Sequence, residues 1–141
     1  MPVAVASDHA GFELKELLKS HLRELGHEVL DLGTNSTASV DYPDFGFAMG
    51  EALDTGLAER GVVICGTGIG ISIAANRNSA VRAALCYNTT AARLARQHNN
   101  ANVLALGARL VGTEVAKDCL EVFLATAYEG GRHDRRVAKL S

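Results

Sequence analysis

Residues 62–72 constrain the fold more than any other part of the chain. Residues 62–65 are apolar and mostly β-branched, as in a short parallel strand that is covered on both faces. Gly66, Gly68 and Gly70 follow, and they remove side chains where the chain must turn sharply into a helix. Their amide groups and the positive end of that helix can converge on one point. This stretch therefore predicts an anion-binding loop.

A thiol lies at the entrance of this loop. A cysteine at a helix N-terminus ionises more readily than a free one, so Cys65 can act as a base or nucleophile. The alternative is that the glycines only form a tight turn and Cys65 is a small core residue. Ile71 and Ser72 follow the last glycine, which matches neither a Walker loop nor a dinucleotide-binding loop. The loop is thus an anion cradle without a nucleotide signature.

Bulk composition excludes several classes of protein. A chain of 141 residues, 48% of them apolar, fits one globular domain over residues 1–141. A net charge of −2 and the absence of Trp favour neither nucleic acid nor an acidic membrane as a partner. No apolar stretch is long enough to span a bilayer, no signal peptide is expected, and three widely spaced cysteines form no disulfide framework. We therefore expect a cytoplasmic protein.

Strand-like and helix-like segments alternate along the chain. Strands are expected at residues 3–6, 28–32, 62–65, 80–86 and 103–106. This alternation predicts an α/β fold with a five-stranded parallel sheet and helices on both faces. If the strand order is 2-1-3-4-5, the winding direction reverses between the first and third strands, where such folds bind ligands. Asp8, His9 and the glycine loop would then meet there.

Each further polar candidate has a structural alternative. Asp8 can contact a substrate or only cap the first helix, and His9 can contact it too or pack in the first turn. His98 can be an acid or base, or a residue favoured by a helix C-terminal dipole. His98 and Asn99 precede the last strand, so they lie at the opposite edge of the sheet from Cys65. If both His98 and Cys65 are catalytic, a second subunit must supply one of them, which predicts a site at a dimer interface.

Basic residues of the last third form a candidate anion clamp. Arg109 follows the last strand, while Arg132 and Arg136 are four residues apart on one expected helical face. Arginine forks suit a phosphate dianion. The alternative is a solvated basic tail, and Arg135 is expected to be exposed off that face.

Other chemistries have weaker support. The five histidines show no metal-ligand spacing, so no metal is expected. Ser72 lies in no G-x-S-x-G elbow. Cys119 and Cys86 are expected to be core thiols, although Cys86 ends a strand and is the one competitor to Cys65. A base, an anion cradle, a second acid or base and a cationic clamp fit proton transfer beside a carbonyl of a phosphorylated substrate, through an enediolate and without a cofactor.

Several motifs in combination resemble the type B ribose-5-phosphate isomerases, a group that includes the galactose-6-phosphate isomerase subunits. The resemblance covers essentially the whole chain. The motifs are SDHAG at residues 7–11, DYP at 41–43, ICGTGIGISIAAN at 64–76, RQHN at 96–99, NVL at 102–104 and YEGGRH at 128–133. It implies a Rossmann-like α/β/α sandwich, a homodimer or dimer of dimers with sites shared between subunits, a sugar-phosphate substrate and no metal.

The resemblance also implies roles for individual residues. Cys65 would move the proton between C1 and C2, Thr67 would assist at the reacting oxygens, and His98 would open the furanose ring. The amides of residues 66–70 would hold the enediolate, so the cradle would serve the reacting end and not the phosphate. The remaining substrate-binding residues would be Asp8, His9, Tyr42, Gly66, Gly68, Ile69, Gly70, Asn99, Arg109, Arg132 and Arg136.

Three functions follow from this reading. The first is interconversion of D-ribose 5-phosphate and D-ribulose 5-phosphate in the pentose phosphate pathway. The second is isomerisation of a six-carbon sugar phosphate, such as allose or galactose 6-phosphate. The third is a non-catalytic sugar-phosphate-binding module, which would not need Cys65, His98 and the two tail arginines together.

Overall fold

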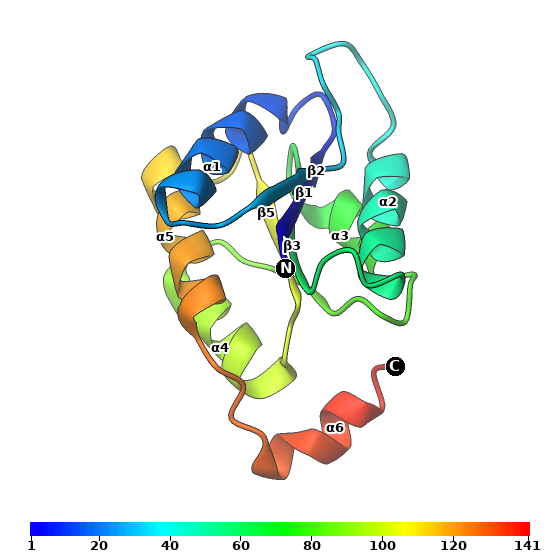
Figure 1. The fold of residues 1–141 in the computed structure, drawn as a ribbon, viewed down its shortest axis with the longest axis vertical. Coiled ribbons are helices and arrows are strands. Elements are labelled where there is room, and N and C mark those ends of the chain that lie inside the picture. The colour runs from blue at the N-terminus through cyan, green and yellow to red at the C-terminus, as the bar shows by residue number, and fades with distance from the viewer.

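One parallel sheet of five strands forms the middle layer of the computed structural model, which describes residues 1–141 (Figure 1). The strands are β1 (Val3–Ser7), β2 (Val29–Asp31), β3 (Arg60–Cys65), β4 (Ala83–Leu85) and β5 (Val103–Gly107). The helices are α1 (Phe12–Glu24), α2 (Tyr42–Asp54), α3 (Ile69–Ala75), α4 (Thr89–Asn99), α5 (Thr113–Ala125), the 3₁₀ turn η1 (Gly131–His133) and α6 (Asp134–Ala138).

Helices cover both faces of the sheet, as the alternating pattern predicts. On one face α1, α4 and α5 pack against the strands, and on the other face α2 and α3 do so (Figure 1). Leu14, Leu18 and Leu22 recur every four residues along α1, so they form one buried stripe against the first face. Met49 and Ile71 belong to the core of the second face. The three-layer α/β/α prediction is therefore confirmed.

The order of the strands is β2-β1-β3-β5-β4, so the expected order 2-1-3-4-5 is wrong in its last two strands. All five residues of β5 are buried, whereas the three residues of β4 are only half-buried. A fully buried strand belongs inside a parallel sheet, and a short, partly exposed one belongs at its edge. The reversal between β1 and β3 is unaffected, and the swap brings the end of β5 beside the end of β3.

Two further expectations need correction at helix ends. The helix of the glycine loop begins at Ile69 and not after Gly70, because Gly68 takes the N-cap position in a left-handed conformation. Arg132 and Arg136 do not share one α-helix, since Arg132 lies in η1 and Arg136 lies in α6. Arg132, Arg135 and Arg136 are all exposed, so exposure does not separate them. No helix combines the length and the apolar character needed to cross a membrane.

A buried lysine ties α1 to β2. Lys15 is fully buried, and its ammonium donates hydrogen bonds of 2.9 and 2.8 Å to the two carboxylate oxygens of Asp31. Lys19 donates a further hydrogen bond of 2.7 Å to Asp31. A buried charge is tolerated only when it is paired and hydrogen-bonded, so Asp31 is what allows Lys15 to occupy the interior.

Replacing Asp31 by Asn is expected to lower the free energy of unfolding by about 3 kcal/mol, because Lys15 would remain charged and buried with only the 3.3 Å contact to Glu16 as an ion pair. Urea unfolding at neutral pH measures this loss. Glu51→Gln is the matched control, since Glu51 is exposed on α2 and forms no ion pair. A loss below about 1 kcal/mol for Asp31→Asn would show that the pair contributes no more than a surface one.

The same pair makes stability depend on pH. Burial raises the pKa of Asp31, but hydrogen bonds from Lys15, Lys19 and the Gly33 amide outweigh it, so the pKa lies below its ordinary value. A pKa lowered by folding stabilises the protein above the unfolded pKa, and this contribution is lost as pH falls through the folded value. The wild type should therefore lose stability below about pH 4, and Asp31→Asn should lose less over that range.

Candidate active site

An open cleft of about 440 Å³ lies where β1 and β3 end, at the point where the winding of the sheet reverses. The loops after these strands meet there although more than fifty residues separate them in the sequence. The cleft is lined by Asp8, Tyr42, Cys65, Gly66, Thr67, Ile69, Gly70, Ile73 and Arg109. All of these except Ile73 are among the predicted site residues. Ile73 lies four residues after Ile69, on the same face of α3, and this spacing was the available signal.

Cys65 is the last residue of β3, and it lines the cleft although only 5% of it is exposed. Its sulfur accepts a hydrogen bond of 3.1 Å from the amide of Gly68. The sulfur therefore faces the N-terminal end of α3, where backbone amides stabilise negative charge. This arrangement suits a thiol that must give up and recover a proton.

Three backbone amides of the loop that follows this sulfur have no internal partner. The amides of Gly66, Thr67 and Gly70 donate no hydrogen bond within the chain. The amide of Ile69 bonds only to the hydroxyl oxygen of Thr67, at 3.2 Å, which leaves the Thr67 hydroxyl hydrogen free to donate. Unpaired N–H groups that line a cleft form an anion cradle of the kind predicted from the glycine pattern.

The three glycines of the loop exclude a side chain for different physical reasons. Gly68 has a φ of +77°, a conformation that side chains rarely adopt. Gly66 and Gly70 instead allow close approach, because a Cβ would press on the guanidinium of Arg109 at Gly66 and overlap the ring of Tyr42 at Gly70. These two contacts explain how Arg109 and Tyr42 come to line the cleft.

Gly68→Ala is expected to reduce turnover by more than about 100-fold, because it would displace the amide that bonds the Cys65 sulfur. The new Cβ would lie 2.6 Å from a methyl group of Leu85 and 2.8 Å from the carbonyl carbon of Leu106. Gly56→Ala is the matched control, since Gly56 has a φ of +78° but nothing within 4 Å of its Cβ position. Gly56→Ala should cost about 1 kcal/mol of stability and leave turnover unchanged. Equal effects of both substitutions on turnover would contradict the role of the Gly68 amide.

Asp8 and His9 follow β1 directly. Asp8 is buried, accepts a 3.1 Å hydrogen bond from the amide of Gly11 and also lines the cleft. It therefore holds the first turn before α1 and faces the site at the same time. Nδ1 of His9 accepts a 3.1 Å hydrogen bond from the amide of Val40, which fixes the loop that precedes α2.

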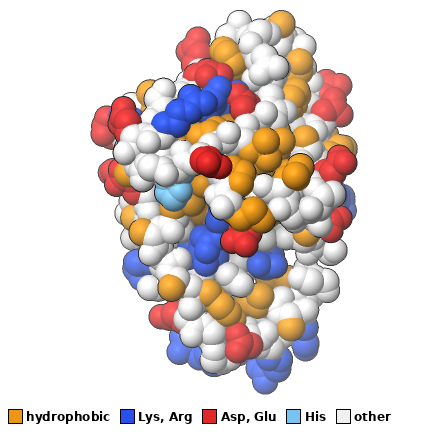
Figure 2. Space-filling model, viewed as in Figure 1, with side chains coloured by type: hydrophobic (Ala, Val, Ile, Leu, Met, Phe, Trp, Pro, Cys, Tyr) orange, Lys and Arg blue, Asp and Glu red, His pale blue; other side chains and the backbone are white.

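Six predicted residues do not line this cleft. His9 and Gly68 are directly beside lining residues in the chain, whereas the other four lie elsewhere. His98 and Asn99 are in the last turn of α4, and Asn99 lines a separate cavity with Arg82 and Leu140. Arg132 and Arg136 lie in η1 and α6, at the end of the molecule opposite the loop before α2 (Figure 1). Lys and Arg side chains gather around that end in the space-filling view (Figure 2). One chain alone therefore does not bring them to Cys65.

The other two thiols belong to the core. Burial raises the pKa of Cys86 to about 12, and Cys86 is 1% exposed. Burial also raises the pKa of Cys119. Neither thiol lines the cleft, so Cys86 does not compete with Cys65 for the role of base.

One cluster of ionisable side chains was not predicted from the sequence. His98, Glu129 and His133 come together at the end of α4, although no ligand spacing had been recognised among the histidines. The available signal was the four-residue spacing of Glu129 and His133 beside the helix-ending His98.

Fold and cleft together define an open α/β protein with a cleft of unpaired backbone amides at the reversal point of its sheet. The sequence model of the ribose/galactose isomerase family matches residues 3–140. Ribose-5-phosphate isomerase B of Escherichia coli is 46% identical over 139 residues, which cover 99% of this chain and 93% of that protein. The chain belongs to the ribose/galactose isomerase family.

Solved structures agree with this assignment. Ribose-5-phosphate isomerase B of Clostridium thermocellum superposes with a TM-score of 0.98 at 49% identity, covering 99% of this chain and 95% of that one. The enzyme of Mycoplasma genitalium, solved with bound ribulose 5-phosphate, superposes with a TM-score of 0.92 at 42% identity, covering 99% and 93%.

Proposed function

We propose that this chain interconverts D-ribose 5-phosphate and D-ribulose 5-phosphate through an enediolate. The observation that carries the proposal is that Cys65 lines the same cleft as Gly66, Thr67 and Gly70, whose amides are unpaired. Aldose–ketose isomerisation needs a base beside the carbon that loses its proton and donors beside the oxygen that gains charge. The relatives that bear this activity in their names span the chain almost completely, which supports the same chemistry here.

Proton transfer runs between neighbouring carbons. The Cys65 thiolate takes the proton from C2 of the open-chain aldose, and the electron pair moves onto the C1 oxygen. The amides of Gly66, Thr67 and Gly70 donate to the resulting enediolate, as in an oxyanion hole. The Thr67 hydroxyl assists the transfer of the hydroxyl proton between the two oxygens. The Cys65 thiol exchanges its proton with solvent and then gives a proton to C1, which yields the ketose and restores the thiolate.

Groups further along the cleft hold the rest of the sugar phosphate. Asp8 and His9 contact the sugar or phosphate, and Tyr42 lines the pocket. Arg109 lies over Gly66 with an exposed guanidinium, so it can pair with an anionic oxygen. Gly68 and Ile69 shape the loop that carries the donors.

A second subunit completes the site in this proposal, in a homodimer or a dimer of dimers. His98, which opens the furanose ring, comes from the partner together with Asn99 and the phosphate-binding Arg132 and Arg136. The rim of the cleft supports such a contact because Tyr42, Ile69 and Ile73 are 43%, 46% and 55% exposed there. Large apolar side chains gathered beside a site are typical of a protein interface.

We place the reaction in the cytoplasm, within the pentose phosphate pathway, and without a metal or other cofactor. All three cysteines are free thiols, which is usual for proteins of a reducing compartment. The proposed chemistry moves protons only, and the cleft already supplies a base and its electrostatic partners.

A six-carbon substrate is the second candidate, because the matching family model covers galactose isomerases as well. Ketose formation from ribose 5-phosphate, allose 6-phosphate and galactose 6-phosphate, measured as kcat/KM, separates the two. We expect the pentose phosphate to be preferred by at least about tenfold, since one added CH–OH group changes the length of the pocket that is needed. A preference for either hexose phosphate would replace the proposed substrate, and no turnover of any would favour a binding module.

A further inference from the structure

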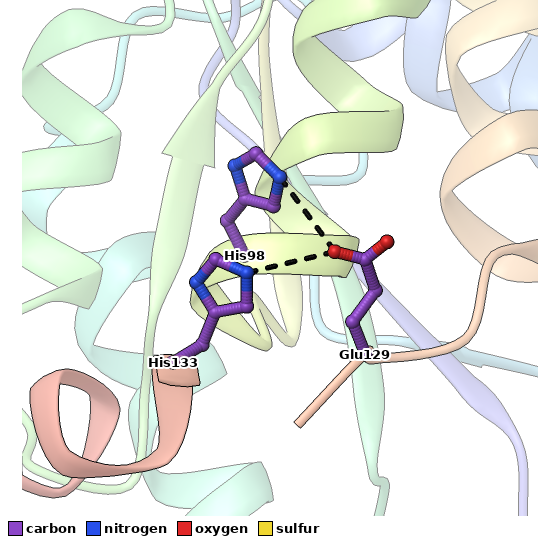
Figure 3. A group of neighbouring side chains, drawn as sticks. All are labelled: His98, Glu129 and His133. Atoms are coloured by element: carbon purple, nitrogen blue, oxygen red, sulfur yellow. Dashed lines mark ion pairs between the residues drawn. The ribbon is translucent and has the colours of Figure 1, made fainter. Parts of the chain in front are cut away.

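Two imidazole rings and one carboxylate meet at a point outside the Cys65 cleft (Figure 3). His98 comes from the last turn of α4, Glu129 from the segment after α5, and His133 from η1. Nε2 of His98 lies 3.7 Å from Oε1 of Glu129, and Nε2 of His133 lies 3.5 Å from the same oxygen. The two rings stack with centroids 4.5 Å apart and planes inclined by 18°.

Local backbone contacts hold the cluster in place. The amide of Glu129 donates a 3.1 Å hydrogen bond to the carbonyl of Gln97, which joins the segment after α5 to the end of α4. The amide of His133 donates to the carbonyl of Gly130 at 3.2 Å. Segments that are thirty residues apart therefore present their side chains to one another on a fixed backbone.

The environment of His133 indicates a missing partner. His133 is only 8% exposed, and its Nε2 is buried without a hydrogen bond. A buried polar nitrogen without a partner is costly, so such groups usually bind a ligand, an ion or water. This nitrogen is directed at Glu129 and at the side of the cluster where His98 lies (Figure 3).

Two of the three distances within the cluster, those from each imidazole to Glu129, are close to the separation of ligands that share an ion. Contacts of 3.5 and 3.7 Å are longer than the 2.7–3.2 Å of an N–H to O hydrogen bond. Ligands bound at about 2.0–2.2 Å around one tetrahedral zinc ion lie about 3.3–3.6 Å from each other. All three ligand atoms already lie within 4.8 Å of one another. Imidazole lone pairs lie in the ring plane, so the half-exposed His98 ring must turn out of its stack on His133 before both nitrogens face one ion.

We propose that His98, Glu129 and His133 form a binding site for a divalent transition-metal ion such as Zn²⁺, and that the bound ion inhibits the enzyme. Two imidazole nitrogens and one carboxylate oxygen are a ligand set for zinc and not for Mg²⁺ or Ca²⁺, which prefer oxygen. Inhibition rests on the proposed function, because a metal on Nε2 would prevent His98 from transferring the proton that opens the sugar ring.

Isothermal titration of Zn²⁺ into the full chain tests the site without any need for activity. We expect one ion per chain in the wild type and in Cys65→Ala, which removes the competing thiol of the cleft. Glu129→Gln and His133→Gln should each weaken binding by more than about tenfold. Glu129 is half-exposed, so its substitution should not disturb folding. His27→Gln, which alters a histidine outside the cluster, should bind as the wild type does.

Activity measured over the same titration tests the inhibition. Wild-type turnover should fall with the midpoint of zinc binding and return when EDTA is added, whereas His133→Gln should keep its own turnover at that concentration. Unchanged zinc affinity in both Glu129→Gln and His133→Gln would overturn the site. Zinc binding at the cluster with full turnover would overturn the inhibition. An enzyme inactive on every sugar phosphate that still binds zinc would overturn the proposed function and leave the metal site standing.

Discussion

The Cys65→Ala protein is expected to fold as the wild type does and to lose at least about 10³-fold in turnover of ribose 5-phosphate. The substitution removes the group that takes the proton from C2, and no other carboxylate or thiol of the cleft occupies its place beside the glycine loop. The unpaired amides and Arg109 remain, so binding of the sugar phosphate should change little. Initial rates and a direct binding measurement on the same preparation give both quantities.

Cys86→Ala is the control for this result. Cys86 is a buried thiol of the core whose pKa is raised to about 12, so its loss should lower stability slightly and leave turnover intact. Turnover of Cys65→Ala within tenfold of the wild type would contradict its role as the base. Loss of turnover and binding together would instead assign Cys65 to the shape of the cleft.

Dimers formed by mixing two inactive variants should recover activity that neither variant has alone. Cys65→Ala and His98→Ala chains are each expected to be inactive. In a heterodimer, one of the two sites would combine Cys65 from one chain with His98 from the other. Random exchange of equal amounts makes half of the dimers mixed, so activity should reach about a quarter of the wild-type value.

Subunit exchange must be verified in that experiment, for example by native mass spectrometry of chains that differ in mass. A mixture of Cys65→Ala with Gly68→Ala is the matched control, because both changes lie on the same side of the proposed site and no intact site can form. Verified exchange without recovered activity would show that His98 and Cys65 do not belong to a shared site.

The sequence pattern was sufficient to predict most of the residues that line the cleft. Local spacing predicted the strand, the glycine loop and Cys65, and the topology of alternating strands brought Asp8 to the same edge of the sheet. These predictions depend on short-range features and on the handedness of crossover connections, both of which a single sequence contains. Eight of the predicted residues consequently line one cleft.

Strand order depends on burial, which the sequence shows less directly. The segments that become β4 and β5 are both short and apolar, so periodicity does not decide which of them lies inside the sheet. In the structure all of Val103–Gly107 is buried, and Arg82 precedes a β4 that is only half-buried. This arrangement carries Arg109 to the side of Gly66, a contact that the expected order would have removed.

Long-range side-chain clusters were the other feature that the sequence did not reveal. Thirty-one positions separate His98 from Glu129, and their meeting depends on how the segment after α5 folds back onto α4. The tail arginines raise the same difficulty on a larger scale, because their proposed partner is the cleft of another subunit. Neither of these long-range contacts produces a periodic pattern in the sequence.

The central claim is that this chain moves a proton between C1 and C2 of ribose 5-phosphate by means of Cys65. Proton NMR of ribose 5-phosphate in D₂O, with the purified protein and a chelator, tests it most directly. The account predicts that ribulose 5-phosphate appears while deuterium enters at the carbon that gains the proton, and that Cys65→Ala gives neither signal. Ketose formation without any exchange even at early times, or no ketose at high enzyme concentration, would contradict it.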